Sequence, residues 1–233
     1  YCDALESIKL PDSVTEIGSH AFAGCNALGS IKMSPNLKEI GEYGFAWCRS
    51  LESIKLPDGV TKIKECTFYG CNNLKSIELP DSVTEIGKLA FAGIDCKNIK
   101  LPKKLKIIDN GAFAQCDSLK GIELPDSVIR LGDYAFEYSS LTSIKLSGSL
   151  QSINPRVFYN CSSLKSIELP RNIKIIGDYA FEACFKLENI KILGNVTKIG
   201  AGAFRDCRNL KSIKLPKSVK EIGQDAFEEA GLK

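Results

Sequence analysis

Phenylalanine recurs along this chain of 233 residues at an almost fixed interval. Successive rings are 22 or 23 residues apart, at Phe22, Phe45, Phe68, Phe91, Phe113, Phe136, Phe158, Phe181, Phe204 and Phe227. A fixed period in this range is typical of a solenoid, in which each repeat buries its apolar face against its neighbours. The pattern predicts a single elongated domain over residues 1–233, built from about ten repeats. Because the chain opens partway through a repeat, we expect it to be part of a longer protein.

Each repeat contains a short segment in which apolar and polar residues alternate. In residues 74–80 this segment reads Leu-Lys-Ser-Ile-Glu-Leu-Pro, and close copies recur along the chain. Alternation is the period of a half-buried strand, and proline ends the strand because it has no N–H to donate. We therefore expect about ten strands, one per repeat, in one parallel sheet.

The return path of each repeat supplies the rest of the core. In its cleanest form it reads Asp-Ser-Val-Thr-Glu-Ile-Gly, at residues 12–18. We expect Val14 and Ile17 to point inward and Gly18 to permit a tight bend. Ala21 and Phe22 follow, and the phenylalanine column is predicted to form a hydrophobic spine opposite the sheet.

The ten cysteines mostly follow the repeat rather than a disulfide pattern. Eight share one slot, which also accepts isoleucine, serine and alanine, so we expect small, buried, reduced thiols there. A one-residue deletion moves Cys96 into a leucine slot. Cys66 lies at a variable position two residues before Phe68, and it is the thiol that we expect to be reachable.

The unit Leu-x-x-Ile-x-Leu-Pro-x-x-Val-x-x-Ile-Gly-x-x-Ala-Phe-x-x-Cys resembles the BspA-like leucine-rich repeat, also called the Treponema pallidum type, across residues 2–232. This resemblance implies an α/β-type repeat solenoid that is mostly strand and coil, right-handed, with one parallel sheet of about ten strands. It also implies a non-catalytic binding module of a secreted or cell-surface protein, often involved in adhesion. The family carries no catalytic residues over to this chain.

Each strand segment contains an Ile-x-Leu triplet, and the middle residues of these triplets form one outward-facing column. It consists of Lys9, Lys32, Lys55, Glu78, Lys100, Glu123, Lys145, Glu168, Lys191 and Lys214. Seven lysines and three glutamates give +4, against +3 for the whole chain. Such a strip would attract an acidic protein or an anionic glycan on a host or neighbouring cell. The alternative is that lysine and glutamate simply form cross-strand pairs that keep the face soluble.

Aromatic residues indicate a second possible contact edge. Tyr43 with Trp47, and Tyr134 with Tyr138, are spaced to form paired patches on the convex side. This edge is a stronger hypothesis than the lysine strip only if the rings are exposed together, because partial burial of tyrosine and tryptophan is common.

Other classes of function find little support in the sequence. His20 is the one histidine of the sequence, and a single histidine at a variable surface slot gives no histidine-rich metal site and no Ser-His-Asp triad. We therefore expect that the protein is not an enzyme and that it binds no metal and no cofactor. The small net charge argues against nucleic acid, and no long apolar run predicts membrane insertion. The remaining alternatives to a surface binding module are a structural spacer and an intracellular protein-interaction scaffold.

Overall fold

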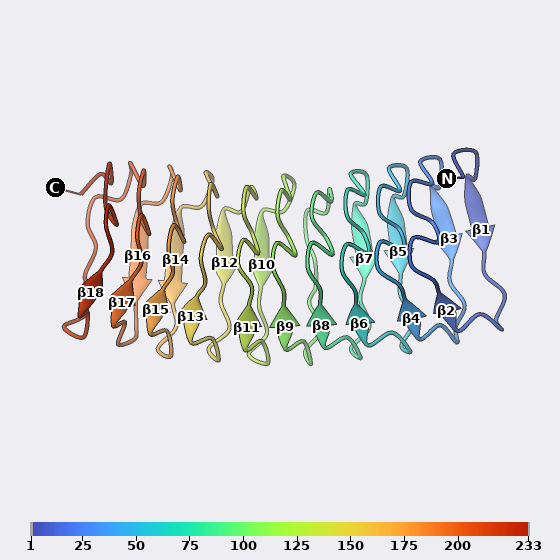
Figure 1. The fold of residues 1–233 in the computed structure, drawn as a ribbon, viewed down its shortest axis with the longest axis horizontal. Coiled ribbons are helices and arrows are strands. Elements are labelled where there is room, and N and C mark those ends of the chain that lie inside the picture. The colour runs from blue at the N-terminus through green and yellow to red at the C-terminus, as the bar shows by residue number, and fades with distance from the viewer. Residues whose placement is uncertain (1, 233) are drawn as a thin grey trace.

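Residues 2–232 form a helix-free parallel β-solenoid in the computed structural model, which describes this part of the chain (Figure 1). Each repeat makes one coil, and the coils stack in sequence order along the long axis. The two described ends of the chain therefore lie at opposite ends of the molecule. The predicted fold class is confirmed in this form.

The Ile-x-Leu triplets form the first column of strands, as predicted, but in eight coils rather than ten. Residues 98–100 and 212–214 are not strands, and the gap after β7 is visible in Figure 1. The first of these gaps directly follows the shortened segment 93–96. The strands pair in parallel two by two, as β1–β3, β5–β7, β10–β12 and β14–β16, so the single sheet that we expected is divided into four two-stranded sheets. They are β1 (Ser7–Lys9), β3 (Ser30–Lys32), β5 (Ser53–Lys55), β7 (Ser76–Glu78), β10 (Gly121–Glu123), β12 (Ser143–Lys145), β14 (Ser166–Leu169) and β16 (Asn189–Ile192).

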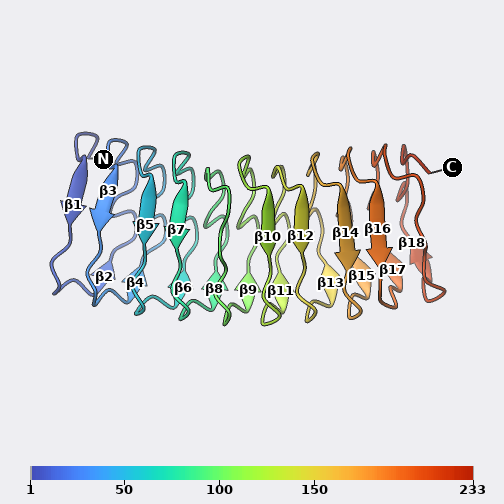
Figure 2. The same ribbon diagram turned by 180° about the vertical axis from the view of Figure 1, so that it is seen from behind.

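A second column of ten two-residue strands was not expected from the sequence. These strands lie along the lower edge of the molecule in Figures 1 and 2. They pair in parallel in three groups, β2–β4, β6–β8–β9–β11 and β13–β15–β17–β18. In register, Ile17 lies beside Ile40, and its side chain is buried. The strands are β2 (Glu16–Ile17), β4 (Glu39–Ile40), β6 (Lys62–Ile63), β8 (Glu85–Ile86), β9 (Ile107–Ile108), β11 (Arg130–Leu131), β13 (Ser152–Ile153), β15 (Ile175–Ile176), β17 (Lys198–Ile199) and β18 (Glu221–Ile222).

The glycine after these strands has a different role from the bend that we expected. Gly41 donates its N–H to the carbonyl oxygen of Ile17 at 2.8 Å, which continues the ladder between coils. A Cβ atom on Gly41 would lie 2.4 Å from the backbone nitrogen of Ser19 in the preceding coil. Glycine is therefore required by the close approach of two backbones. Gly18, in the first coil, has no such neighbour within 4 Å.

The phenylalanine column forms the predicted hydrophobic spine. Each ring stacks on the next, with centroids 5.2 to 5.8 Å apart along the whole column. The eight inner rings are fully buried, whereas Phe22 and Phe227 at the two ends are only partly buried. The spine therefore joins the coils into one continuous core.

The backbone beside each phenylalanine is left-handed at two positions, two residues before and two residues after the ring. Fifteen non-glycine residues and five glycines have positive φ, which gives two for each of ten phenylalanines. Around Phe45, for example, the N–H groups of Tyr43, Phe45 and Trp47 all donate to carbonyl oxygens of the next coil. These three hydrogen bonds per coil hold the turns on this side in register, although side chains disfavour the left-handed conformation.

Most thiols of the cysteine column are buried and hydrogen-bonded, as predicted for this slot. The Sγ of Cys71, for example, donates to the carbonyl oxygen of Phe45 in the preceding coil at 3.0 Å. The same bond recurs down the column at 3.0 to 3.3 Å. Burial raises the pKa of the Cys116 thiol to about 12. Cys2 is the exception, because it is exposed in the first coil.

The prediction that Cys66 is reachable was wrong. Its side chain is 2 % exposed. Cys66 occupies a left-handed position, with φ of 52°. Burial raises the pKa of this thiol, and a hydrogen bond with Tyr43 opposes the effect. Cys96, in the leucine slot, is also buried.

Candidate recognition surfaces

The lysine strip is the ten-residue column from Lys9 to Lys214 described above. All ten residues are exposed. Eight of them lie on the solvent face of the first strand column, and Lys100 and Lys214 lie in the two triplets that form no strand. Figure 2 shows the strands that carry it side by side. Whether these residues bind a ligand stays a prediction.

Ion pairs neutralise much of the lysine strip. Lys55 and Glu78 are 2.9 Å apart, Lys191 and Glu168 are 2.8 Å apart, and Lys145 pairs with Glu123. All three glutamates of the strip thus pair with a lysine on a neighbouring coil, which favours the alternative of cross-strand pairing.

Four lysines of the strip form no ion pair within residues 2–232. They are Lys9, Lys32, Lys100 and Lys214. Lys9 and Lys32 are direct neighbours in the β1–β3 register. Together with Lys55 they line a shallow hollow of about 630 Å³. Two of the four unpaired lysines of the strip are thus adjacent at its N-terminal end, although Asp12 also lines their hollow.

The aromatic edge lies on the turns beside the phenylalanine spine. Its four predicted residues all occupy left-handed positions. Trp47, Tyr134 and Tyr138 are 36 %, 39 % and 44 % exposed, and Tyr43 is partly buried. The structure separates them into two groups, as the sequence spacing suggested. In the first, Tyr43 stacks on His20 at 4.7 Å, and Trp47 meets Tyr69 edge to face at 5.5 Å.

The second group is an arginine–tyrosine patch, which we define as Tyr134, Tyr138, Arg156, Tyr159 and Tyr179. The guanidinium carbon of Arg156 lies 5.8, 5.3 and 5.2 Å from the ring centroids of Tyr134, Tyr159 and Tyr179. Tyr138 meets Tyr159 edge to face at 5.4 Å. Arg156 thus links three successive coils through cation–π contacts.

Arg156 was missed in the sequence, although a signal for it was present. It occupies the slot two residues before Phe158, where neighbouring coils carry Tyr134 and Tyr179. Residues in one slot lie side by side in a solenoid, so this spacing could have found the patch.

The two arginines near the patch differ in their charge partners. Arg205 donates from Nε to Glu182 at 2.8 Å, and that carboxylate is nearly buried. Arg156 forms no ion pair within the described chain. Burial raises the pKa of the nearby Glu137 carboxyl, and the charge of Arg156 acts in the opposite direction. Arg156 is therefore positioned by rings rather than by a salt bridge.

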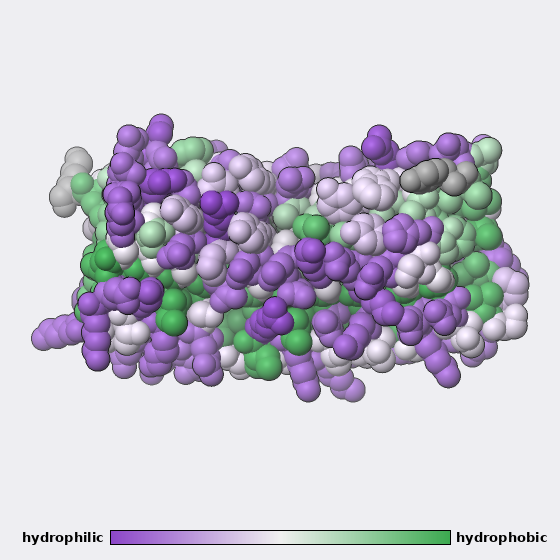
Figure 3. All heavy atoms as spheres, in the orientation of Figure 1, coloured by the Kyte–Doolittle hydropathy of each residue, from purple (hydrophilic) through white to green (hydrophobic). Residues whose placement is uncertain are grey.

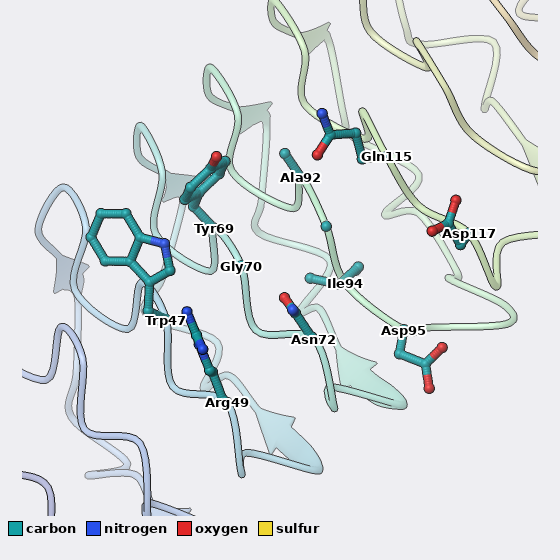
Figure 4. Close-up of a pocket in the computed structure, with 11 residues that line it drawn as sticks. Trp47, Arg49, Tyr69, Gly70, Asn72, Ala92, Ile94, Asp95, Gln115 and Asp117 are labelled. Atoms are coloured by element: carbon teal, nitrogen blue, oxygen red, sulfur yellow. The ribbon is translucent and has the colours of Figure 1, made fainter.

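A polar hollow of about 380 Å³ lies next to the first aromatic group. Figure 4 shows Trp47 and Tyr69 on one side, with Arg49 below them, and Gln115 and Asp117 on the opposite side. Gly70 and Gly93 lie between the two sides. This hollow was not predicted from the sequence.

Residues 2–232 contain no group of three or more histidine, cysteine, aspartate or glutamate side chains placed to hold a metal ion. His20 is exposed and stacked on Tyr43, away from any nucleophile pair. The same part of the chain has no helix of the length and apolarity needed to cross a membrane.

The surface between these features is mixed in character. In the view of Figure 3, hydrophilic residues cover most of the molecule and apolar residues appear between them in small areas. No single large apolar area dominates that view. Recognition on this face would therefore depend on individual aromatic and charged groups.

Comparison with known proteins identifies the family. The model of the BspA type leucine-rich repeat region matches in six copies, over residues 1–120, 39–152 and 129–233. A leucine-rich repeat protein from Bacteroides ovatus is 33 % identical, with a TM-score of 0.77, over 98 % of this chain and 74 % of that one. Comparison with curated proteins finds no significant match.

Two further solved structures are similar. A leucine-rich repeat protein from Eubacterium ventriosum is 17 % identical, with a TM-score of 0.65, over 98 % of this chain and 83 % of that one. A leucine-rich cell surface protein from Faecalibacterium prausnitzii is 26 % identical, with a TM-score of 0.48, over 96 % of this chain and 80 % of that one. The coil period, the stacked phenylalanines and the match of the family model along the whole sequence show that this chain belongs to the BspA-type leucine-rich repeat family.

Proposed function

We propose that this chain is a non-catalytic recognition module that binds a protein partner through the arginine–tyrosine patch. Leucine-rich repeat proteins commonly bind proteins, which supports the general class. The observation that carries the choice of surface is the position of Arg156 over three tyrosine rings without a carboxylate partner in the described chain.

The chemistry of the patch suits protein recognition. Tyrosine and arginine are enriched among the residues that contribute most to protein interfaces. Tyr134 and Tyr138 are exposed on either side of Phe136 in one coil, and Arg156 can donate hydrogen bonds to a partner carboxylate or carbonyl. The coil backbone already fixes these side chains in place, so binding orders few additional groups.

The N-terminal end of the lysine strip is a second candidate surface. Lys9 and Lys32 are neighbours without an ion pair in residues 2–232, and Lys55 completes their hollow. An acidic protein or an anionic glycan on a host or neighbouring cell would suit this charge. The paired glutamates along the rest of the strip make it the weaker candidate.

Family resemblance supports a place in a secreted or cell-surface protein that takes part in adhesion. The rivals are a structural spacer, whose surfaces bind nothing specific, and an intracellular protein-interaction scaffold. Recovery of the full-length sequence, with or without a secretion signal, distinguishes a surface location from an intracellular one.

The proposal is tested by affinity capture from host extracellular proteins and immobilised anionic glycans at physiological salt. Each captured protein is then purified and its affinity measured for three forms of the chain. These are the parent, a patch variant with Tyr138→Ala and Arg156→Gln, and a strip variant with Lys9→Glu and Lys32→Glu. Circular dichroism verifies that both variants are folded.

The expected result is a purified partner that binds the parent and the strip variant equally and binds the patch variant at least roughly tenfold more weakly, or about 1.4 kcal/mol. If only the strip variant loses binding, the lysine strip is the site and the proposal is wrong. If neither capture experiment yields a ligand, the spacer interpretation replaces it.

A further inference from the structure

The polar hollow beside Trp47 arises from two successive glycines in one slot. The position two residues after the phenylalanine holds Trp47, then Gly70, then Gly93, then Gln115 in four neighbouring coils. Large side chains on both sides and none between leave a space of about 380 Å³. Single small residues, Gly24 and Ala183, occupy the same slot in two other coils, but Gly70 and Gly93 are the one pair of glycines that follow each other in it.

The floor of the hollow is fixed rather than loose. A Cβ atom on Gly70 would lie 2.8 Å from the Trp47 ring, so the indole packs directly against this glycine. The amide nitrogen of Asn72, in its favourable orientation, donates to the carbonyl oxygens of Gly70 and Gly93 at 2.7 and 3.1 Å. This arrangement leaves the Asn72 amide oxygen as an acceptor at the site.

One wall of the hollow is aromatic, and the remainder is lined by planar polar groups. Trp47 and Tyr69 are 5.5 Å apart and nearly perpendicular, at 88°. On the far side are Asp117, which forms no ion pair or side-chain hydrogen bond in the described chain, and Gln115 (Figure 4). Arg49 likewise has no ion pair in residues 2–232. Its guanidinium points up toward Trp47 in the same view.

We infer that this hollow binds a neutral saccharide of one or two rings. The C–H faces of a sugar ring carry partial positive charge and pack against the negative face of an aromatic ring. The hydroxyl groups would donate to Asp117 and to the amide oxygen of Asn72, and would accept from Arg49. A volume of about 380 Å³ is at the small end of the range for ligand pockets, roughly 300–1,000 Å³, which limits the bound portion to one or two rings.

The charges of the hollow favour a neutral ligand over an anion. Asp95 and Asp117 contribute two negative charges, and Arg49 contributes one positive charge. The net charge of −1 opposes a phosphate or sulfate group. The hollow adjoins the arginine–tyrosine patch, because Gln115 and Asp117 also line a neighbouring hollow with Tyr138. None of the patch residues lines the polar hollow itself, so this inference does not depend on the proposed protein partner.

Tryptophan fluorescence provides a direct test, because Trp47 is the only tryptophan of the chain. The folded protein is titrated with maltotriose, cellotriose, chitotriose and mannotriose, and with glucose 6-phosphate as the anionic comparison. We expect at least one neutral saccharide to give a saturable change in Trp47 emission. Calorimetry verifies the affinity independently of the fluorophore.

Two variants locate the binding site. Gly93→Gln places a side chain in the hollow, where the nearest atom to a Cβ is 3.7 Å away and where the next coil already carries Gln115. Asp117→Ala removes an acceptor that the described chain does not use internally. Ala183→Gln is the matched control, because Ala183 occupies the same left-handed slot in a distant coil.

The expected outcome is a loss of affinity of at least tenfold in Gly93→Gln and Asp117→Ala, with no change in Ala183→Gln. The inference is overturned if none of the four neutral saccharides gives a saturable signal up to its solubility limit. It is also overturned if both hollow variants bind as tightly as the parent, or if glucose 6-phosphate binds more tightly than every neutral saccharide. Loss of protein binding in the variant with Tyr138→Ala and Arg156→Gln tests the proposed protein site and is measured separately from saccharide binding.

Discussion

Phe113→Ala tests how much the phenylalanine spine contributes to stability. Phe113 is fully buried in the middle of the chain. Its ring stacks on Phe91 and on Phe136, with centroids 5.5 Å away on both sides. Removal of the ring therefore leaves a cavity and breaks two aromatic contacts.

The expected loss in the free energy of unfolding is about 4–5 kcal/mol, in the upper part of the roughly 3–5 kcal/mol range for replacement of a buried phenylalanine by alanine. Each lost aromatic pair contributes about 0.5–1.5 kcal/mol of that amount. Hydrogen bonds between coils, such as Phe113 N–H to Ala135 O at 2.8 Å, hold the spacing and prevent the cavity from closing. Phe22→Ala is the matched comparison, because Phe22 is partly buried and stacks on one ring only. We expect about 2–3 kcal/mol for that variant.

Urea unfolding followed by circular dichroism and by Trp47 fluorescence measures both quantities. Circular dichroism reports on all coils, whereas fluorescence reports on the coils near Trp47. Because each coil contacts only its neighbours, a weak point at position 113 should separate the two transitions in Phe113→Ala. In the parent and in Phe22→Ala the two transitions should coincide more closely. Equal losses of stability in the two variants, or a loss below about 2 kcal/mol in Phe113→Ala, would refute the reasoning.

Three further predictions concern the thiols and the left-handed turns. In the native protein a thiol-alkylating reagent should modify Cys2 quickly and Cys66 only after unfolding. The labelling rate of each cysteine is measured by mass spectrometry, and equal rates for the two residues would contradict the burial of Cys66. Burial raises the pKa of the Cys116 thiol to about 12, above the value of about 8.5 for a thiol in the unfolded chain. The stability that the buried, protonated thiol contributes is therefore complete below about pH 8.5 and is lost as the pH rises toward 12. Cys116→Ala should therefore reduce the fall in stability between these pH values, and an unchanged slope would argue against this origin. Ala183→Gly should stabilise the protein by up to about 1 kcal/mol, because Ala183 has the left-handed φ of 57° that glycine adopts more easily. Ala180→Gly in the same coil should instead destabilise the protein by about 1 kcal/mol. Thermal unfolding measures both variants, and the opposite order of stability would contradict the role of φ.

The properties that repeat in every coil could be predicted from the sequence. The spacing of the phenylalanines predicted the stacked spine, and the shared cysteine slot predicted buried thiols. The triplet alternation predicted the first strand column, although residues 98–100 and 212–214 do not form strands. These predictions succeeded because a solenoid places one slot of every repeat in one environment, so that a single reading of the repeat applies to all of them.

The features that depend on contact between coils could be found only in the tertiary structure. Gly41 is required by the backbone of Gly18 and Ser19 in the preceding coil, 22 or 23 residues away in the sequence, and a single repeat does not show that contact. Cys66 is buried, whereas Tyr134 in the same left-handed slot is exposed, so the position within the repeat does not by itself decide burial. The hollow beside Trp47 exists because Gly70 and Gly93 follow each other in space. The sequence by itself determined which residues share a column. The tertiary structure decided which atoms each residue of a column contacts, because those contacts depend on the distance between adjacent backbones and on the volume of the side chains in the neighbouring coils.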